Sequence, residues 1–219
     1  TLIQTGDIHG HLVPRPNLRS DAIDSKMEGG VARMYTAIKQ IQKDATKCAK
    51  VNGVLKCTDY SLLLNTGDTL QGSGEALFSR GQAMIDVLNN FGFVAHAPGN
   101  WDFLYGPARF EETFKGANGN PPLANWNAMA SNLYYTNQFD DSAVCGLTAT
   151  DPATGTLRPR KRVLPTYMIK QVGNVKVGIL GFSAGGQATL VAASNDLKFP
   201  AKDIAESHKP DFLMLLYAY

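Results

Sequence analysis

Short, nearly continuous apolar runs alternate along the chain with segments whose apolar residues recur every three or four positions. The first pattern is typical of buried strands and the second of amphipathic helices. We expect strands at Leu2–Thr5, Leu62–Asn65, Phe93–Ala97, Ala128–Asn132, Thr166–Gln171, Val175–Phe182 and Phe212–Leu216. We expect helices at Val31–Lys43, Met84–Asn90 and Ala108–Phe114, with a shorter candidate at Asp203–Ser207. This alternation predicts an α/β fold.

Composition and charge narrow the possible partners. The chain has 219 residues, enough for one domain or one and a half, and 44% of them are hydrophobic. Its 21 basic and 19 acidic residues nearly balance, and the basic cluster at 158–162 is short, so we expect no nucleic-acid polymer as a partner. No stretch reaches the roughly 18–20 apolar residues that cross a bilayer, so we expect no membrane span. The chain opens directly on an expected strand, an abrupt start that is typical of a processed or engineered terminus.

Two of the three cysteines bracket a hairpin signal. Cys48 and Cys57 enclose a segment with Asn52-Gly53 at its centre and short apolar flanks; Cys145 is the third. Asn-Gly favours a tight β-hairpin, which would bring Cys48 and Cys57 together. A disulfide there would favour an oxidising compartment, and the alternative is two free thiols on a surface excursion. A zinc site is disfavoured because no histidine lies nearby.

Polar clusters follow three of the expected strands at their carboxyl ends. They are Gly6-Asp7-Ile8-His9-Gly10-His11, Asn65-Thr66-Gly67-Asp68-Thr69 and Pro98-Gly99-Asn100-Trp101-Asp102. In α/β sheets, ligands bind in the crevice beyond the carboxyl ends of the strands. Oxygen donors with one or two imidazoles suit Mn²⁺, Mg²⁺, Zn²⁺ or Fe. The candidate metal ligands are Asp7, His9, Asp68 and Asn100, and we expect them to converge at one edge of the sheet.

A carboxylate such as Asp68 can bridge two metal ions about 3.5–4 Å apart, the spacing of two-metal hydrolases. Such a pair of ions orients a phosphate and lowers the pKa of a bridging water, which supplies a nucleophile at neutral pH. Each cluster alone is a weak signal, because short motifs of this kind occur by chance. The three clusters in order, each at a strand end, are strong together.

The three clusters resemble the first three metal-binding blocks of the calcineurin-like metallophosphoesterases. Within that superfamily the sequence is most similar to the periplasmic or extracellular 5′-nucleotidases, from Leu2 to about Leu216. Matching segments beyond the three clusters are Gly29-Gly30-Val31-Ala32-Arg33, Gln71-Gly72-Ser73, Ala130-Ser131-Asn132 and Val175–Gly181. The resemblance implies a four-layer αββα sandwich with the metals at one edge of the β-layers.

The resemblance also implies roles for single residues. Asp7 and His9 would bind the first of two divalent ions, Asp68 would bridge both, and Asn100 would bind the second. Asn100 and Asp102 would belong to the catalytic centre.

Two further residues are candidates for contact with the substrate. His11 could contact the phosphate, and a solvated loop histidine is its alternative. Trp101 could wall the mouth of the pocket, with simple packing as the alternative. His96, inside an expected apolar strand, is expected to be a packed and hydrogen-bonded core histidine.

The residue after Asn100 departs from the family pattern. Most members have a histidine there, which helps to stabilise the transition state or protonates the leaving group, whereas this chain has Trp101 and keeps an acidic residue at Asp102. A general acid contributes about 10²–10⁴-fold in rate, so the tryptophan weakens the nucleotidase interpretation without altering the metal site. An aromatic residue here also resembles the dimanganese thiosulfohydrolases of bacterial sulfur oxidation.

The leading interpretation is a secreted or periplasmic, metal-dependent phosphoric ester hydrolase of the 5′-nucleotidase type. Its substrate would be a nucleotide or another small phosphate ester, attacked by a water that two metal ions activate. Mn²⁺ is the first choice of metal, with Zn²⁺, Mg²⁺ or Fe as alternatives. Other interpretations are action on a cyclic nucleotide, a thiosulfohydrolase-like enzyme of sulfur oxidation, and a non-catalytic metallophosphoesterase-like module.

The resemblance implies that residues 1–219 form an N-terminal catalytic domain that lacks its C-terminal part and the nucleotide-specificity domain. In the family, the strand matching Phe212–Leu216 leads to a histidine ligand, and a later Gly-His-x-His segment supplies two more. The remaining histidines of this chain, His96 and His208, do not fall at those positions. We therefore expect the isolated chain to bind one ion weakly or none, and to be inactive.

Overall fold

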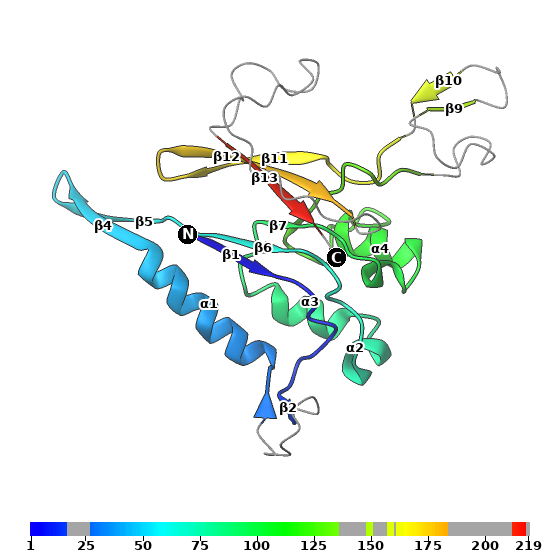
Figure 1. Ribbon diagram of the computed structural model, residues 1–219, viewed down its shortest axis with the longest axis horizontal. Coiled ribbons are helices and arrows are strands. Elements are labelled where there is room, and N and C mark those ends of the chain that lie inside the picture. Colours follow the sequence, from blue (N-terminus) through cyan, green and yellow to red (C-terminus); the bar gives the residue numbers. More distant parts are fainter. Residues whose placement is uncertain (17–26, 136–147, 151–156, 160, 184–211, 218–219) are drawn as a thin grey trace.

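In a computed structural model, two β-sheets and a layer of helices form the body of the protein (Figure 1). The structure describes residues 1–16, 27–135, 148–150, 157–159, 161–183 and 212–217. The helices are α1 (Val31–Ala45), α2 (Gly74–Phe78), α3 (Gln82–Leu88) and α4 (Pro107–Phe114), with a short 3₁₀ turn η1 (Trp101–Phe103). The strands of the two main sheets are β1 (Leu2–Thr5), β6 (Leu62–Asn65), β7 (Ala95–His96), β8 (Asn127–Ala128), β11 (Tyr167–Val172), β12 (Val175–Phe182) and β13 (Phe212–Tyr217). Three two-stranded pairs complete the described elements: β2 (Arg15–Pro16) with β3 (Met27–Glu28), β4 (Thr46–Val51) with β5 (Val54–Asp59), and β9 (Thr148–Thr150) with β10 (Leu157–Pro159).

The first sheet is parallel and has the order β1-β6-β7-β8. All four residues of β6 are buried, which explains why this strand is continuously apolar up to Asn65. Because the strands run in parallel, their carboxyl ends meet at one edge of the sheet.

Each face of this sheet is covered. On one face, Ile3 of β1 and Leu63 of β6 belong to a buried cluster that includes Ile38 of α1, Ile85 of α3 and Phe110 of α4. On the other face, the alternate residues of β6 pack against the second sheet.

That second core, between the sheets, contains Leu62 and Leu64 from β6 and Val177 and Ile179 from β12. The second sheet has the order β11-β12-β13, with β11 antiparallel and β13 parallel to β12. The described residues thus build the helix layer and the two β-layers of an α/β sandwich. An outer helical layer of the expected αββα arrangement has no counterpart among them.

Most expected elements are present, and the differences have local causes. Strand β8 ends at Ala128, short of the expected Asn132, because the chain then crosses to the second sheet: the backbone N–H of Ala130 donates to Pro165 and that of Ser131 to Gly181. The sequence did not predict helix α2, because its five residues are too few to show a helical period. The expected helix at 203–207 lies outside the described residues.

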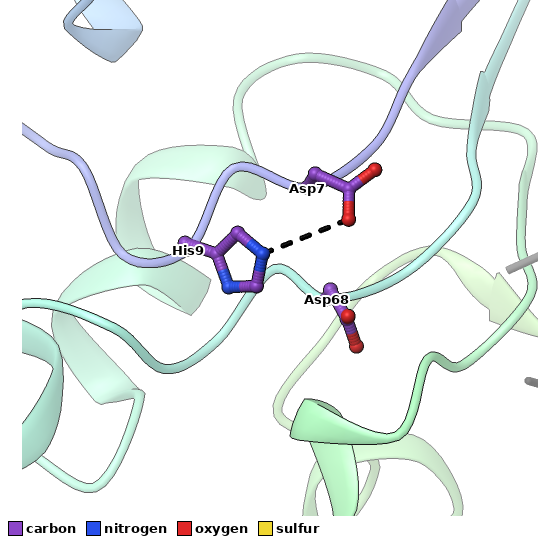
Figure 2. Close-up of side chains that lie close together, drawn as sticks. All are labelled: Asp7, His9 and Asp68. Atoms are coloured by element: carbon purple, nitrogen blue, oxygen red, sulfur yellow. Dashed lines mark ion pairs between the residues drawn. The ribbon is translucent and has the colours of Figure 1, made fainter. Parts of the chain in front are cut away.

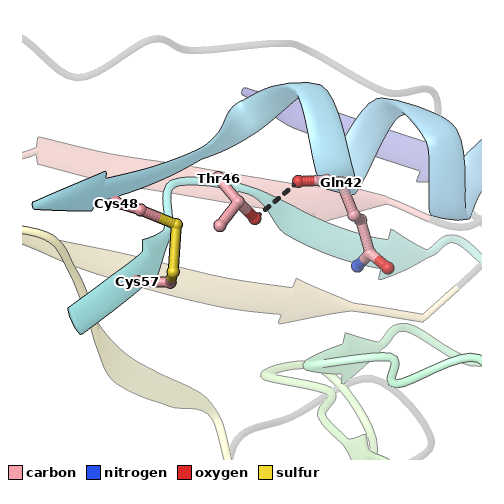
Figure 3. The surroundings of a disulfide bond; sticks show 4 residues. All are labelled: Gln42, Thr46, Cys48 and Cys57. Carbon is pink, nitrogen blue, oxygen red and sulfur yellow. Dashed lines mark hydrogen bonds between the residues drawn. A yellow bond between two sulfur atoms is a disulfide. The ribbon is translucent and has the colours of Figure 1, made fainter. Parts of the chain in front are cut away.

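Strands β4 and β5 form an exposed hairpin that projects beyond α1 (Figures 1 and 3). Asn52 and Gly53 both have positive φ, at 50° and 78°, as a type I′ turn requires. Cys48 and Cys57 lie directly opposite each other, and their sulfur atoms are bonded. At the base of the hairpin, the hydroxyl of Thr46 donates to the carbonyl of Gln42 at 2.8 Å.

No helix in the described part of the chain has both the length and the apolar character needed to span a membrane.

The hairpin generates a prediction about thiols. Titration of the unfolded, unreduced protein should find one free thiol, from Cys145, because Cys48 and Cys57 are paired. Replacing both by serine should lower the free energy of unfolding by about 2–3 kcal/mol, the chain-entropy value for so short a loop. Denaturant unfolding of the wild type and the double variant measures this difference. Three free thiols in the wild type would contradict the pairing.

Candidate metal centre

The loops after β1 and β6 run side by side and continue the pairing of the two strands beyond the sheet. The backbone N–H of Asp7 donates to Gly67 at 3.0 Å, that of His9 to Asp68 at 2.9 Å, and that of Gly10 to Thr69 at 3.0 Å. This continued pairing brings Asp7, His9 and Asp68 together at the edge of the sheet where the strands end.

Asp7, His9 and Asp68 form a cluster that we call the ligand trio (Figure 2). One potential ligand atom of each lies within 4.8 Å of those of the other two. His9 Nε2 lies 3.6 Å from Asp7 Oδ1. Among the described residues, this is the one group of three or more His, Cys, Asp or Glu side chains with metal-site spacing.

The chemistry of the trio fits a divalent cation. Asp68 is buried, Asp7 is exposed, and the ring of His9 is partly buried with an Nδ1 atom that has no hydrogen-bond partner. Two carboxylates and an imidazole are the donor set that suits Mn²⁺, Zn²⁺ or Fe. A buried ring nitrogen without a hydrogen-bond partner is costly unless a ligand or a proton reaches it.

All three residues of the trio have left-handed backbone conformations. Their φ angles are 51° for Asp7, 47° for His9 and 49° for Asp68. Few residues other than glycine adopt this region, and such conformations concentrate at functional sites. Half of the six described non-glycine residues with positive φ are therefore in the trio.

Glycines allow the loops to approach closely. A Cβ atom on Gly67 would lie 2.2 Å from the backbone nitrogen of Gly99, and one on Gly99 would lie 2.1 Å from Oδ1 of Asp68. A Cβ on Gly72 would lie 2.4 Å from the carbonyl oxygen of His9. Only a residue without a side chain fits at these contacts, so Gly67, Gly72 and Gly99 allow the loops to pack closely.

Asn100 lies beside the trio. Its neighbours in sequence both contact Asp68: Gly99 through the close approach just described, and Trp101 through its backbone N–H, which donates to Oδ1 of Asp68 at 2.8 Å. Asn100 itself is exposed at the start of η1. The third cluster is thus brought to the first two, as the sequence predicts for residues at the ends of parallel strands.

Trp101 covers one side of the trio. Its ring packs edge-on against the ring of His9, with centroids 4.7 Å apart, and the residue is 38% exposed. An aromatic surface therefore stands beside the trio and is accessible to a ligand. His11 is also exposed, and its Nδ1 lies 3.0 Å from the carbonyl oxygen of Ile8 in its own loop.

Asp102, expected to belong to the catalytic centre, lies in the core and not at the surface where a substrate could reach it. Its side chain is fully buried, and its two oxygens accept hydrogen bonds from four backbone N–H groups. The donors are Asp68 and Gly99 to Oδ2, at 3.1 and 3.0 Å, and Thr69 and Leu70 to Oδ1, at 3.0 and 3.2 Å. A substrate cannot reach this carboxylate, so its environment is that of a group that holds the loops after β6 and β7 together.

His96 is a packed core histidine, as expected. It is 0% exposed and stacks on Phe114 with ring centroids 4.9 Å apart. Its Nδ1 lies 3.0 Å from Oδ1 of Asn65, and its Nε2 lies 3.4 Å from Oδ2 of Asp102. The sequence contained no signal for this link to Asp102, because the two residues share neither a motif nor a helical spacing.

The two buried carboxylates have opposite pKa shifts. Burial raises the pKa of Asp68, with a further rise from the charge of Asp102, and these effects exceed the lowering by the Trp101 N–H. Burial also acts to raise the pKa of Asp102, but His96 and the backbone N–H groups of Thr69 and Gly99 outweigh it, so the pKa is lowered. The environment of Asp102 therefore favours its charged form, whereas the environment of Asp68 disfavours its charged form.

The curated relatives that match this sequence are 5′-nucleotidases. No family model matches the chain. A 5′-nucleotidase of Rattus norvegicus is 28% identical over 218 residues, which are 99% of this chain and 31% of that protein. A snake venom 5′-nucleotidase of Gloydius brevicauda is 25% identical over 186 residues, which are 84% of this chain and 25% of that protein. The chain thus spans about a quarter to a third of the length of these curated relatives.

Solved structures share the fold. A 5′-nucleotidase precursor of Thermus thermophilus matches with a TM-score of 0.56 at 22% identity, over 83% of this chain and 28% of that one. The calcineurin-like phosphoesterase YfkN of Bacillus subtilis matches with 0.52 at 20% identity, over 83% and 47%. The sulfate thiohydrolase SoxB of Thermus thermophilus matches with 0.53 at 19% identity, over 83% and 35%. The α/β sandwich expected from the sequence is confirmed.

The raised pKa of Asp68 predicts that the substitution Asp68→Asn stabilises the metal-free chain, although it removes a candidate metal ligand. Because the folded state binds the proton of Asp68 more tightly than the unfolded state, the metal-free chain should lose stability as the pH rises above the ordinary value of 3.8. Asp68→Asn removes this charge and keeps an oxygen for the Trp101 N–H. The metal-free variant should melt a few degrees higher than the wild type at pH 7, since 1 kcal/mol shifts the midpoint by about 2–4 °C in a domain of this size.

Thermal melts at pH 7 and at pH 3 measure the effect, which should vanish at the lower pH where both states are protonated. Mn²⁺ bound at the trio should broaden the amide signals of residues 7–10, and the same variant should abolish that broadening. Asp44→Asn, an exposed carboxylate on α1, is the control and should change neither quantity. A lower midpoint for Asp68→Asn at pH 7 would contradict the stated origin of the pKa shift.

Proposed function

We propose that this chain serves metal-dependent hydrolysis of a phosphoric ester. The proposal starts from the resemblance of the chain to metallophosphoesterases of the 5′-nucleotidase type, which its relatives and structural neighbours support. The observation that carries the proposal is the ligand trio, Asp7, His9 and Asp68, at the strand-end edge of a fold shared with phosphoesterases. Because the chain spans only part of its relatives, we propose that it corresponds to their N-terminal catalytic domain.

In this proposal each residue at or near the trio has a defined task. Asp7 and His9 would hold one divalent ion, Asp68 would serve as a ligand of two, and Asn100 would contribute to the second. Divalent ions bound there would stabilise charge on the phosphoryl oxygens and activate water for attack. Trp101 offers its exposed face to the part of the substrate beyond the phosphate.

A nucleotide is the substrate class that the relatives favour, since both are 5′-nucleotidases. An aromatic ring such as Trp101 provides a surface on which a planar base can stack. The bonded Cys48–Cys57 pair, together with the venom origin of one relative, favours a secreted or periplasmic protein.

One observation favours a second candidate function. Trp101 provides no proton, and Asp102 is buried and occupied by four backbone donors, so neither can protonate a leaving group. A substrate whose leaving group needs no proton, such as a thiol sulfur, suits this arrangement better than an alkoxide does. A thiohydrolase that shares the fold, SoxB, makes sulfate bound through sulfur the alternative substrate.

The number of ligands limits what residues 1–219 can do alone. Among the described residues, the trio and Asn100 supply four side chains, too few for two complete metal spheres. We therefore expect the 219-residue chain to bind one Mn²⁺ ion weakly or none, and to show negligible turnover. Robust Mn²⁺-dependent hydrolysis of AMP by this chain would show that its ligand set is complete.

Substrate choice and mechanism are tested on a longer form that continues through the length its relatives share. With Mn²⁺, we expect hydrolysis of AMP to exceed that of a cyclic nucleotide and of a thiosulfate-type substrate. Asp68→Ala should lower the rate at least about 100-fold, because a ligand shared by two ions contributes several kcal/mol. Asp44→Ala is the matched control and should keep full activity. Preference for the sulfur substrate would support the second function, and full activity of Asp68→Ala would refute both.

A further inference from the structure

The β4–β5 hairpin has an exposed apolar tip. All six residues of β5 and five of the six in β4 are exposed. At the tip, Val51, Val54 and Leu55 are 43%, 61% and 62% exposed. A lone two-stranded hairpin is marginally stable in water, and here the Cys48–Cys57 bond closes it. The chain therefore holds three neighbouring apolar side chains in solvent, an arrangement typical of an interaction surface.

A second hairpin lies against the base of the first. Gly173, in the turn between β11 and β12, approaches Tyr60 so closely that a Cβ atom on it would lie 2.1 Å from Cε1 of the ring. Tyr60 directly follows β5. Both hairpins point toward the same side of the molecule in Figure 1, and Val175, next to the turn of the second hairpin, is 42% exposed. We call residues 46–59 and 167–176 the hairpin face.

The hairpin face is basic. It has five lysines and one acidic residue, Asp59, whereas the whole chain has 21 basic and 19 acidic residues. The lysines are Lys47, Lys50, Lys56, Lys170 and Lys176. Lys50 lies opposite Leu55 in the hairpin register, so positive charge directly flanks the apolar tip. Lysine side chains bury their aliphatic stems along apolar surface and keep the ammonium group at a polar boundary.

The hairpin face and the ligand trio lie at opposite ends of the parallel sheet. β5 leads through Tyr60 and Ser61 into the first residue of β6, whereas Asp68 follows the last residue of that strand. β1 runs parallel to β6, so Asp7 and His9 also lie beyond the carboxyl ends of the strands. A partner bound to the hairpin face therefore leaves the trio uncovered.

We propose that the hairpin face docks on a lipid bilayer that carries anionic headgroups. Val51, Val54 and Leu55 enter the headgroup region, and the lysines around them contact the anionic headgroups. A convex apolar tip suits a fluid interface, which adapts to its shape, whereas a protein partner must provide a preformed pocket. A second copy of this chain is disfavoured, because two hairpin faces would bring lysines against lysines. The docking does not depend on the proposed hydrolysis.

Docking is measured by cosedimentation of the metal-free chain with vesicles. Vesicles of phosphatidylcholine with about one-third phosphatidylglycerol should bind the chain at least about tenfold more tightly than phosphatidylcholine alone, because each lysine near an anionic surface contributes about fivefold. Added salt should weaken the binding, since it screens the charges. A spin label in the lipid headgroup region should broaden the amide signals of residues 51–55 and not those of residues 7–10.

Two double variants test the two parts of the hairpin face. Val54→Thr with Leu55→Thr places β-branched residues in the strand and removes apolar surface. It should weaken binding at least about tenfold, because each buried CH₂ group contributes about fourfold. Lys50→Gln with Lys56→Gln should also weaken binding at least about tenfold, through the loss of charge. All four positions are exposed, so neither variant should change the melting midpoint.

Val13→Thr with Leu104→Thr is the matched control, because it changes one exposed valine and one exposed leucine outside the hairpin face. Its binding should stay within about twofold of the wild type.

Three results would overturn the proposal. The first is no binding to the anionic vesicles. The second is loss of binding in the lysine variant alone, which indicates adsorption by charge without insertion of the tip. The third is a dimer in sedimentation equilibrium that the threonine variant at positions 54 and 55 dissociates, with no vesicle binding, which would assign the tip to a second copy. Because the vesicle experiments contain no metal, their outcome is independent of whether the chain serves hydrolysis.

Discussion

The Asp102 carboxylate is the group on which the arrangement of the loops after β6 and β7 depends. One side chain binds backbone donors from two different loops, the loop after β6 at Asp68, Thr69 and Leu70 and the loop after β7 at Gly99. A loop normally lies at the surface because its backbone groups need water. Here a buried charge replaces water for both loops, and they can therefore lie against each other with the candidate ligands held between them.

The rest of the site follows from parallel strands that end at the same level. Pairing between β1 and β6 continues into the loops as far as Gly10 and Thr69, so Asp7 and His9 have fixed positions relative to Asp68. The third loop is added by contact, not by pairing, and this contact requires Gly67 and Gly99. The same polar residues on another backbone would not form one cluster, because their spacing in the sequence exceeds 30 positions between loops.

The sequence predicted β6 and β12 well, because all four residues of β6 are buried and most of β12 is buried from Val177 onward, which leaves a clear apolar pattern. It predicted β7 and β8 less well, since each pairs over only two residues before the chain turns toward the trio or the second sheet. The convergence of Asp7, His9 and Asp68 was predictable from their place after strands. The burial of Asp102 was not, because its partners are backbone groups, and a backbone N–H leaves no trace in the identity of a residue.

The left-handed backbone at Asp7, His9 and Asp68 has a consequence for how this sequence tolerates change. Each such residue costs the folded chain roughly 1–3 kcal/mol, which glycine at the same position would avoid. Replacement of the exposed Asp7 by glycine would also break few contacts. A population of variants screened for heat resistance alone would therefore accumulate glycine at position 7 and lose this ligand. The side chains that could bind a metal stand at positions whose backbone conformation lowers the stability of the fold. A random mutation that raises the melting temperature at such a position therefore removes a candidate ligand.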